Sequence, residues 1–340
     1  MPHRGHAMPR LTPLSDCLGH ALAALAPAPV RLVPPADALG ATLAADLTFP
    51  ADLPQSAEAL RQGFAVAALD LMGASPQMPL PLIGAQTVQP GAPLPPGTDA
   101  LLPEEDVETG GNPSLPLALR APAPGEGIRR AGHEARAGAS LAQAGDRVTP
   151  RLALIAELAG LKALALRRPR VRLDLPDPAQ HAFLRAWLRG EGAAVVTEAP
   201  DLVLRRTSDH RPRLALAPGK SAWLGMHEGC CTLHLPTRFD GMIAAVLALG
   251  RPVLAALSGR APEPARPLVL SRKLSSVIGV TELALLAPGA EGWAAEPAGL
   301  LTLSGLARAR AFTLIPPESE GYAAGSTVPA FALEPTGAEP

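Results

Sequence analysis

The sequence has few aromatic residues and a net charge close to zero. Its 340 residues include 6 Phe, 3 Trp and 1 Tyr, which argues against the aromatic platforms on which nucleic-acid bases stack. The 30 Lys and Arg residues nearly balance 31 Asp and Glu, so the formal net charge is −1. A whole-chain attraction to nucleic acid is therefore excluded, although a local basic patch stays open. Charged residues make up 18% of the chain, too few for a disordered charged tail protein. We predict no nucleic-acid partner.

Cysteine and long apolar runs are also scarce. Cys17, Cys230 and Cys231 give no disulfide framework. The adjacent Cys230 and Cys231 are compatible with a soft-metal site, a vicinal disulfide or thiols packed in a strand. Packing is favoured because free cysteines are usually buried. The N-terminus lacks an apolar core of signal-peptide length, and Arg251 and Pro252 interrupt the most apolar stretch, residues 241–259. This stretch predicts a buried helix, so we expect a cytoplasmic protein without a membrane partner.

What the chain does have is turn-forming residues and short apolar runs. Its 40 Pro and 32 Gly residues exclude one long helical bundle, and its length indicates two or more domains. Between residues 51 and 130, short apolar runs such as 63–66 and 100–102 alternate with Pro and Gly. This alternation predicts a small β domain with tight turns.

A strand–helix–strand pattern follows. Residues 171–175 alternate as a strand does, Asp177 and Pro178 open a helix, and apolar runs near residues 193–204 predict two more strands. Such a βαβ unit implies a parallel sheet. Beyond residue 262 the pattern favours short strands, which we place at residues 283–286, 300–303, 311–315 and 328–332.

From the residues alone the chemistry is thin, because the chain has no Walker-type phosphate loop and no GxGxxG after a strand. Each candidate has a structural alternative. The acidic run at residues 104–106 fits Mg²⁺ or a solvated turn. Lys220, after Pro218 and Gly219, fits an anion site or an ordinary surface lysine. Asp177 fits a base or metal ligand, but a helix N-cap is favoured. His133, Glu134 and the arginines before them fit an ion site or surface charge.

The order of these segments resembles the molybdopterin molybdenumtransferase family, of the MoeA and gephyrin E-domain type, from about Leu11 to Leu333. The most similar stretch is residues 88–102, with Gly91-Ala-Pro at its centre. The other matching segments are residues 38–46, 50–54, 56–66, 129–134, 145–150, 168–171, 174–178, 214–220, 235–240 and 279–285.

The chain departs from the family pattern at ligand-binding positions. The functional aspartate of one motif is Gln62 here, the first lysine of the Lys-Pro-Gly-Lys motif is Ala217, and the glycine of the Leu-Pro-Gly-Asn-Pro motif is Thr237. A Ser-Gly-Gly loop and two arginines of the last domain are missing. Phosphate sites depend on exposed backbone N–H groups and fixed cations, so these losses predict weaker transferase chemistry.

The resemblance implies a fold class, which is multidomain α/β and β and MoeA-like. It comprises an N-terminal helical, dimerising domain (9–50 plus 133–168), a small β domain (51–132), a truncated parallel βαβ, MogA-like domain (169–262) and a C-terminal β domain (263–336).

The resemblance also implies a function and its residues. The family inserts molybdate into adenylylated molybdopterin and releases AMP, so molybdate and molybdopterin would be substrates and Mg²⁺ a cofactor. Matching positions give Asp177 and Glu134 as catalytic residues, Gly219, Lys220 and Glu282 as substrate-binding residues, and Glu105 with Asp177 as metal ligands. The expected partners are a second copy in a homodimer, the pterin, and molybdoenzymes or other cofactor-synthesis proteins. The alternative is a catalytically impaired paralogue that binds, delivers or scaffolds molybdopterin.

Overall fold

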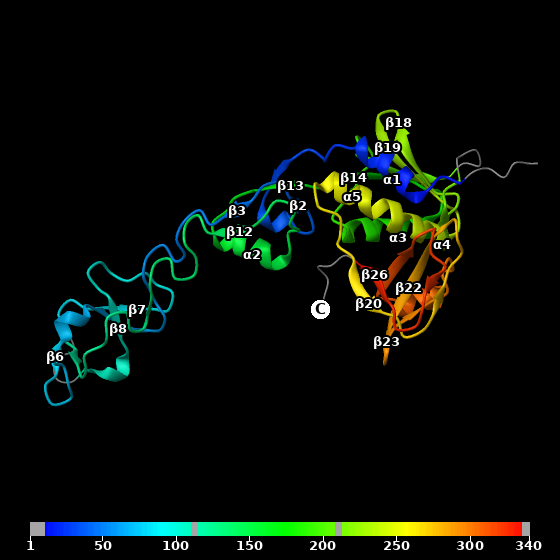
Figure 1. The fold of residues 1–340 in the computed structure, drawn as a ribbon. Helices are drawn as coiled ribbons and strands as arrows, with labels where there is room; N and C mark the ends of the chain where they lie inside the picture. Colours follow the sequence, from blue (N-terminus) through cyan, green and yellow to red (C-terminus); the bar gives the residue numbers. More distant parts are fainter. Residues whose placement is uncertain (1–10, 110–114, 208–212, 335–340) are drawn as a thin grey trace, which may run out of the picture. The chain divides into compact units, whose positions relative to one another are not determined.

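The computed structural model describes residues 11–109, 115–207 and 213–334, which fall into two compact units (Figure 1). Unit 1 comprises residues 1–45, 143–157 and 162–340, and unit 2 comprises residues 46–142 and 158–161. Both units contain sheets, and unit 1 also contains the long helices, so the fold is mixed α/β as predicted. The four-part division of the chain stays a prediction.

The centre of unit 1 is a five-stranded sheet in the order β15-β14-β16-β19-β18. Four strands run parallel, and β18 pairs antiparallel with β19 at one edge. The predicted βαβ unit is confirmed, because α3 connects parallel neighbours β14 and β15. The strands are β14 Arg170–Asp174, β15 Ala194–Val195, β16 Leu202–Arg206, β18 Trp223–His227 and β19 Cys230–Leu235.

Helices cover this sheet because their apolar faces bury against it. Leu184 and Leu188 of α3 are fully buried in the same core as Leu202 and Leu233 of the strands. Cys231 is packed in this core as well, and burial raises the pKa of its thiol to about 12. Cys230 and Cys231 are free thiols in strand β19, with Cys231 buried and Cys230 partly buried, as the packed-thiol interpretation predicts. The helices are α1 Leu14–Ala23, α3 Pro178–Gly190, α4 Phe239–Ala245, the π-helical turn η4 Val246–Gly250 and α5 Arg251–Ser258.

Residues 239–258 form one continuous helix across α4, η4 and α5, which ends at Gly259 in the left-handed region. Its length and composition alone would allow it to cross a membrane, but 89% of its most apolar window is buried within the described fold. That burial is typical of a core helix, as the interrupted apolar pattern predicted.

The remaining parts of unit 1 are two β regions. A small sheet in the order β1-β13-β2 lies beside α2, where Thr149 accepts a hydrogen bond from the Leu152 N–H. The C-terminal sheet has the order β17-β22-β24-β26-β20, with β23 beside β22. The elements are β1 Arg31–Val33, η1 Pro35–Asp37, β2 Thr42–Leu43, α2 Pro150–Leu158, β13 Leu164–Arg167, β17 Leu216–Ala217, β20 Arg266–Val269, β21 Leu274–Ser275, β22 Thr281–Gly289, β23 Gly292–Ala295, α6 Leu303–Arg308, β24 Ala311–Ile315, β25 Gly321–Tyr322 and β26 Thr327–Ala332.

One predicted strand is wrong. Residues 300–303 were expected to be extended, but α6 begins at Leu303. The Thr302 hydroxyl caps this helix by accepting a hydrogen bond of 2.9 Å from the Gly305 N–H. A Thr N-cap satisfies a backbone N–H group at the start of a helix. The apolar run 300–303 by itself gives no indication that Thr302 acts as such a cap.

Unit 2 is built from small sheets with separate small cores. Its central strand β5 pairs with β7 on one side and β8 on the other, and residues 89–99, which include the Gly91–Gly97 run, connect β7 to β8. Gly63 of β5 lies so close to β8 that a Cβ atom would be 2.5 Å from the Leu102 carbonyl oxygen. The elements are β3 Leu47–Thr48, β4 Glu58–Ala59, β5 Gly63–Val66, η2 Ala68–Leu71, β6 Leu80–Pro81, β7 Gln86–Val88, β8 Ala100–Leu102, η3 Glu104–Asp106, β9 Val107–Glu108, β10 Leu117–Ala118, β11 Ile128–Arg129 and β12 Ser140–Ala142.

Candidate functional site

Two of the predicted substrate-binding residues, Gly219 and Lys220, line one cavity in unit 1, of about 560 Å³. We call it the Lys220 cavity. Its walls are the turn after β17 and the segment between β19 and α4. The lining residues are Thr207, Arg213, Ala217, Pro218, Gly219, Lys220, Ser221, Pro236, Thr237, Arg238, Asp240 and Gly241.

The turn that carries Lys220 depends on a glycine. Gly219 has a φ of +127°, and a Cβ atom there would be 3.1 Å from Leu216 Cδ2. Its carbonyl accepts a hydrogen bond of 2.8 Å from the Ala222 N–H, which closes the turn. The turn fixes the backbone at Lys220, which lines the cavity; its side chain is exposed and forms no ion pair with any described residue.

The opposite wall is held by side chains from α3 and β16. Gln180 Nε2 donates to the Thr237 carbonyl at 2.6 Å, and Arg206 Nε donates to the Thr237 hydroxyl at 3.1 Å. The threonine that stands in place of a family glycine therefore has its own polar partner. These bonds fix the backbone that borders the cavity.

The long core helix begins at this cavity. Residues 238, 240 and 241 line it, and α4 starts at Phe239 with no side-chain cap on its first turn. The Gly241 N–H already donates to the Asp240 carboxylate at 2.8 Å, whereas the other N–H groups of this start and the helix dipole favour anions. Asp240 is buried and pairs with Arg238 at 3.2 Å, so Arg213 and Lys220 leave the lining with an excess of positive charge. The cavity thus suits a phosphate or another oxyanion.

The position of the cavity follows a general rule for α/β sheets. Asp174, Arg206 and Leu235 end the parallel strands β14, β16 and β19 at one sheet edge, and ligands of open α/β sheets bind at that carboxyl edge. Sequence reasoning did not select Arg206, Arg213 or Gln180. The signal for Arg206 was available, because it lies two residues after the apolar run 202–204 of a predicted parallel strand.

Asp177 caps α3, as its alternative interpretation predicted. Its Oδ1 accepts hydrogen bonds from the N–H groups of Ala179 at 2.8 Å and Gln180 at 3.0 Å. The carboxylate is exposed and does not line the Lys220 cavity, although Gln180 contacts both Asp177 and Thr237. A catalytic or metal-binding role for Asp177 stays a prediction.

Glu282 lines a different cavity, of about 460 Å³. Its carboxylate is buried and accepts hydrogen bonds from the Ser276 hydroxyl at 2.8 Å and the Val277 N–H at 3.0 Å. On the parallel strands, Ala217 is paired with Glu282, so the two cavities lie near neighbouring strands. These contacts give Glu282 a structural role in holding residues 276–277, and its substrate-binding role stays a prediction.

The two candidates in unit 2 are paired with arginines. Glu134 pairs with Arg129, which also donates to Glu58 at 3.1 Å. Glu105 is 3.7 Å from Arg61, and 70% of its side chain is exposed. Over the described ranges, no group of three or more His, Cys, Asp or Glu side chains is arranged to hold a metal ion. The metal role of Glu105 and the catalytic role of Glu134 stay predictions.

Comparison with known proteins gives consistent matches. Residues 12–160 match the family model described as MoeA N-terminal region (domain I and II). Molybdopterin molybdenumtransferase 2 of Mycobacterium tuberculosis is 34% identical over 172 residues, which cover 40% of this chain and 42% of the relative. The molybdopterin molybdenumtransferase of Synechococcus elongatus is 34% identical over 122 residues, 30% of each chain.

Solved structures extend the likeness to nearly the whole chain. A molybdopterin biosynthesis MoeA protein from Pyrococcus horikoshii has a TM-score of 0.75 at 20% identity, covering 95% of this chain and 99% of its own. Residues 12–160 of this chain are similar to the MoeA N-terminal region, and the chain as a whole has the MoeA fold. This chain is also similar in fold to a molybdenum cofactor biosynthesis protein from Pyrococcus furiosus, with a TM-score of 0.61 at 16% identity and coverage of 95% of this chain and 100% of that one.

The family resemblance inferred from the motifs is therefore confirmed. The structural likeness at this identity establishes the MoeA fold and leaves the chemistry to the residues. The matched sequence spans 42% or less of the lengths of these curated MoeA-family relatives, so activity, substrates and partners are matters for proposal.

Proposed function

We propose that this protein acts in molybdenum cofactor biosynthesis as a molybdopterin molybdenumtransferase-like enzyme. It would insert molybdate into adenylylated molybdopterin with release of AMP. One observation carries the proposal: Gly219 and Lys220, which match the family's Pro-Gly-Lys motif, border the same cavity as Thr237 and the uncapped start of α4. The names of the curated relatives support the same pathway.

In this proposal the Lys220 cavity binds the phosphate-bearing part of the pterin. The Lys220 ammonium acts as a point charge for phosphate, and Arg213 adds a second cation. The N–H groups of Phe239 and Asp240 at the start of α4 donate to the oxygen atoms, since the Gly241 N–H is bonded to Asp240. Asp177 and Glu134 are the proposed catalytic carboxylates, and Glu282 a further substrate contact, all by family resemblance. The residues that position Thr237 would keep its backbone in place as the substrate binds.

Mg²⁺ enters the proposal with the substrate. The described carboxylates form no preformed site of three ligands, and Asp177 Oδ1 already accepts two N–H groups. Protein-bound Mg²⁺ often keeps several waters and binds through one or two carboxylates plus substrate phosphates. Asp177 of unit 1 and Glu105 of unit 2 are each proposed, by family resemblance, as a carboxylate ligand.

The alternative is an impaired paralogue that binds, delivers or scaffolds molybdopterin. A specific observation favours it: the two predicted catalytic carboxylates already have structural partners, Asp177 at the start of α3 and Glu134 beside Arg129. In contrast, Lys220 and Arg213 of the Lys220 cavity form no ion pair with a described residue, so both cations are available to bind a phosphate. This alternative predicts pterin binding without turnover.

The proposal includes the organisation inferred from the family. We propose a cytoplasmic homodimer with a helical domain, a small β domain, a MogA-like α/β domain and a C-terminal β domain at the boundaries given above. Molybdoenzymes or other cofactor-synthesis proteins would receive the product.

The direct experiment is molybdate-dependent conversion of adenylylated molybdopterin by the purified full chain, with and without Mg²⁺, followed by AMP release. Turnover above a no-protein control supports the transferase. Saturable pterin binding without turnover supports the paralogue, and absence of both overturns the two functions. Light scattering of the same preparation tests the homodimer.

A further inference from the structure

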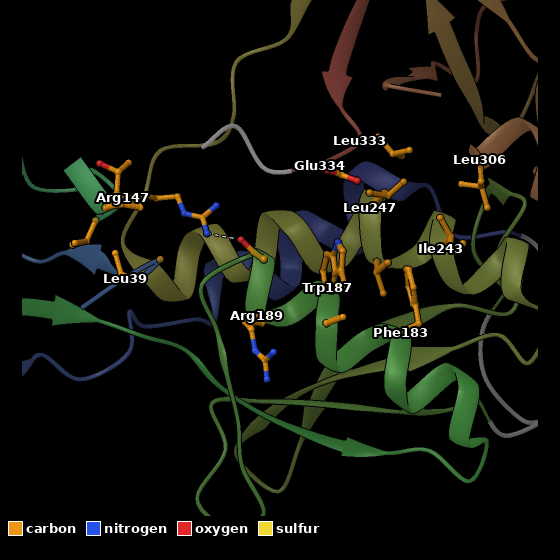
Figure 2. Close-up of a pocket in the computed structure, with 17 residues that line it drawn as sticks. Leu39, Arg147, Phe183, Trp187, Arg189, Ile243, Leu247, Leu306, Leu333 and Glu334 are labelled. Carbon is orange, nitrogen blue, oxygen red and sulfur yellow. Dashed lines mark hydrogen bonds between the residues drawn. The ribbon is translucent and has the colours of Figure 1, made fainter. Parts of the chain in front are cut away.

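A second and larger cavity lies elsewhere in unit 1, with a volume of about 720 Å³ (Figure 2). We call it the Trp187 cavity. It shares no lining residue with the Lys220 cavity. Its lining residues are Leu39, Gly40, Arg147, Val148, Thr149, Pro150, Phe183, Ala186, Trp187, Arg189, Gly190, Ile243, Val246, Leu247, Leu306, Leu333 and Glu334.

Most of the wall is apolar. Phe183 and Trp187 extend from α3 toward the side of the long helix that carries Ile243 and Leu247, as Figure 2 shows. The Phe183 side chain stays 40% exposed although large aromatic groups gain free energy from burial. Binding of an apolar ligand here would be favourable, because it removes the apolar surfaces of the ligand and of the wall from water.

One end of the cavity is cationic. The half-buried Arg147 side chain reaches toward the end of α3, where its guanidinium donates a hydrogen bond to the Gly190 carbonyl oxygen (Figure 2). Burial, and then the charge of Arg260, lower the Arg147 pKa, and Glu191 opposes this effect. The Glu191 carboxylate is already paired with Arg251 at 2.8 Å and lies 3.9 Å from Arg260. The charge of the buried Glu191 carboxylate is therefore already compensated by two other arginines.

The lining as a whole also has an excess of positive charge. It contains the cations Arg147 and Arg189 and the anion Glu334. In Figure 2, Arg189 points away from the labelled apolar side chains, whereas Glu334 lies near Leu247. Arg147 is thus the cation at the end of the apolar wall.

We propose that the Trp187 cavity binds an amphipathic carboxylate, with its apolar body between α3 and the long helix and its carboxylate at Arg147. The volume falls within the range of about 300–1,000 Å³ that small-molecule sites occupy. The apolar wall supplies affinity, and the guanidinium supplies a charge-assisted hydrogen bond that distinguishes an anion from a neutral ligand. The site is separate from the proposed transferase function.

The test is calorimetric titration of the full chain with decanoate and with the neutral analogue decanol. We expect saturable binding of one decanoate per chain. Arg147→Met should weaken decanoate binding at least tenfold and leave decanol binding unchanged, whereas Arg147→Lys, which keeps the charge, should stay within about threefold of wild type. Ala186→Trp, an addition on the exposed face of α3, should reduce binding of both ligands.

Lys220→Met is the control that separates this proposal from the transferase function, because it should leave decanoate binding unchanged. No saturable binding, equal binding by wild type and Arg147→Met, or full binding by Ala186→Trp would each overturn the proposal. Sedimentation velocity tests whether a second copy of the chain occupies the cavity instead. If decanoate binding always accompanies dissociation of a dimer, the cavity is an interface between copies and the proposal is wrong. Circular dichroism and thermal unfolding establish that each variant is folded.

Discussion

Predicted site residues lie both in the Lys220 cavity of unit 1 and in the turns of unit 2 that carry Glu105 and Glu134. Among the described residues, the charges are unpaired in the first region and paired in the second. In the cavity, Lys220 and Arg213 form no ion pair with a described residue. In the turns, Glu105 and Glu134 each pair with an arginine. Charge without a protein partner beside a cavity is available to a ligand, whereas paired surface charge contributes mainly to local structure. The comparison therefore favours ligand binding in unit 1.

The largest expected effect is on binding at the cavity. Lys220→Met should weaken binding of a phosphate-bearing pterin about 10- to 100-fold, because a hydrogen bond to a charged group contributes about 1.5–3 kcal/mol. Calorimetric titration with molybdopterin measures this. The thermal midpoint should not change, because Lys220 is exposed. Lys162→Met, an exposed lysine outside the cavity, is the matched control, and an equal loss in both variants would contradict the assignment.

The second prediction separates capping from chemistry at Asp177. Asp177→Ala should lower the free energy of unfolding by about 1 kcal/mol, since it removes an N-cap, whereas Asp177→Asn should stay within a few tenths because Asn caps equally well. Thermal unfolding measures both. The proposed catalytic role predicts that Asp177→Asn loses turnover while it keeps stability. Full turnover by Asp177→Asn would leave Asp177 with its capping role alone.

Sequence patterns predicted the parts of the fold that depend on apolar periodicity. Residues 63–66 and 100–102 are the strands expected of them, and the βαβ unit has its parallel neighbours. The same physics explains the failure at residues 300–303, where a single Thr hydroxyl decides the helix start. A short apolar run is compatible with either structure.

The candidate site was only partly predictable for a related reason. Gly219 and Lys220 are adjacent in sequence, and a positive φ at the glycine fixes how the turn presents the lysine. Arg206, Gln180 and Thr237 meet only through the fold of three separate segments. Glu282 was assigned to the same site from its motif, but its side chain lines another cavity. Local motifs specify turns, whereas tertiary packing determines which cavity a side chain enters.

The third prediction tests whether paired charges in unit 2 are structural. Arg120 donates to Asp106 at 2.6 Å and to both oxygens of Glu126, at 2.7 and 3.2 Å. Arg120→Met should therefore destabilise unit 2 by about 0.5–1 kcal/mol, the upper range for partly exposed pairs. Hydrogen exchange of the β8 and β10 amides measures it locally. Arg136→Met, whose side chain is 73% exposed, should have no measurable effect, and equal effects would contradict the role of Arg120.

The fourth prediction concerns pH. Hydrogen bonds from Arg120, and then from the Ala123 N–H, lower the pKa of Glu126 in the folded state. A lowered folded pKa contributes stability that is present above the unfolded value of about 4.3 and is lost as the pH falls through the folded value. The protection factors of the unit 2 amides, which are corrected for the intrinsic pH dependence of exchange, should therefore fall below about pH 4, and Glu126→Gln should reduce that fall. An unchanged acid profile in Glu126→Gln would assign the acid sensitivity to other carboxylates.

The smallest effect is expected at Glu105, where the comparison is sharpest. Its carboxylate is 3.7 Å from Arg61 and mostly exposed, so Glu105→Gln should change the stability of unit 2 by less than about 0.5 kcal/mol. The proposed metal role makes a different prediction, that Glu105→Gln raises the Mg²⁺ concentration needed for half-maximal AMP release. Titration of Mg²⁺ at fixed pterin separates the two, with Glu108→Gln, another exposed acid nearby, as the control. If the half-maximal Mg²⁺ concentration rises in Glu105→Gln and not in Glu108→Gln, Glu105 is a metal ligand. Loss of the exposed Arg61–Glu105 ion pair changes the free energy too little to cause such a rise.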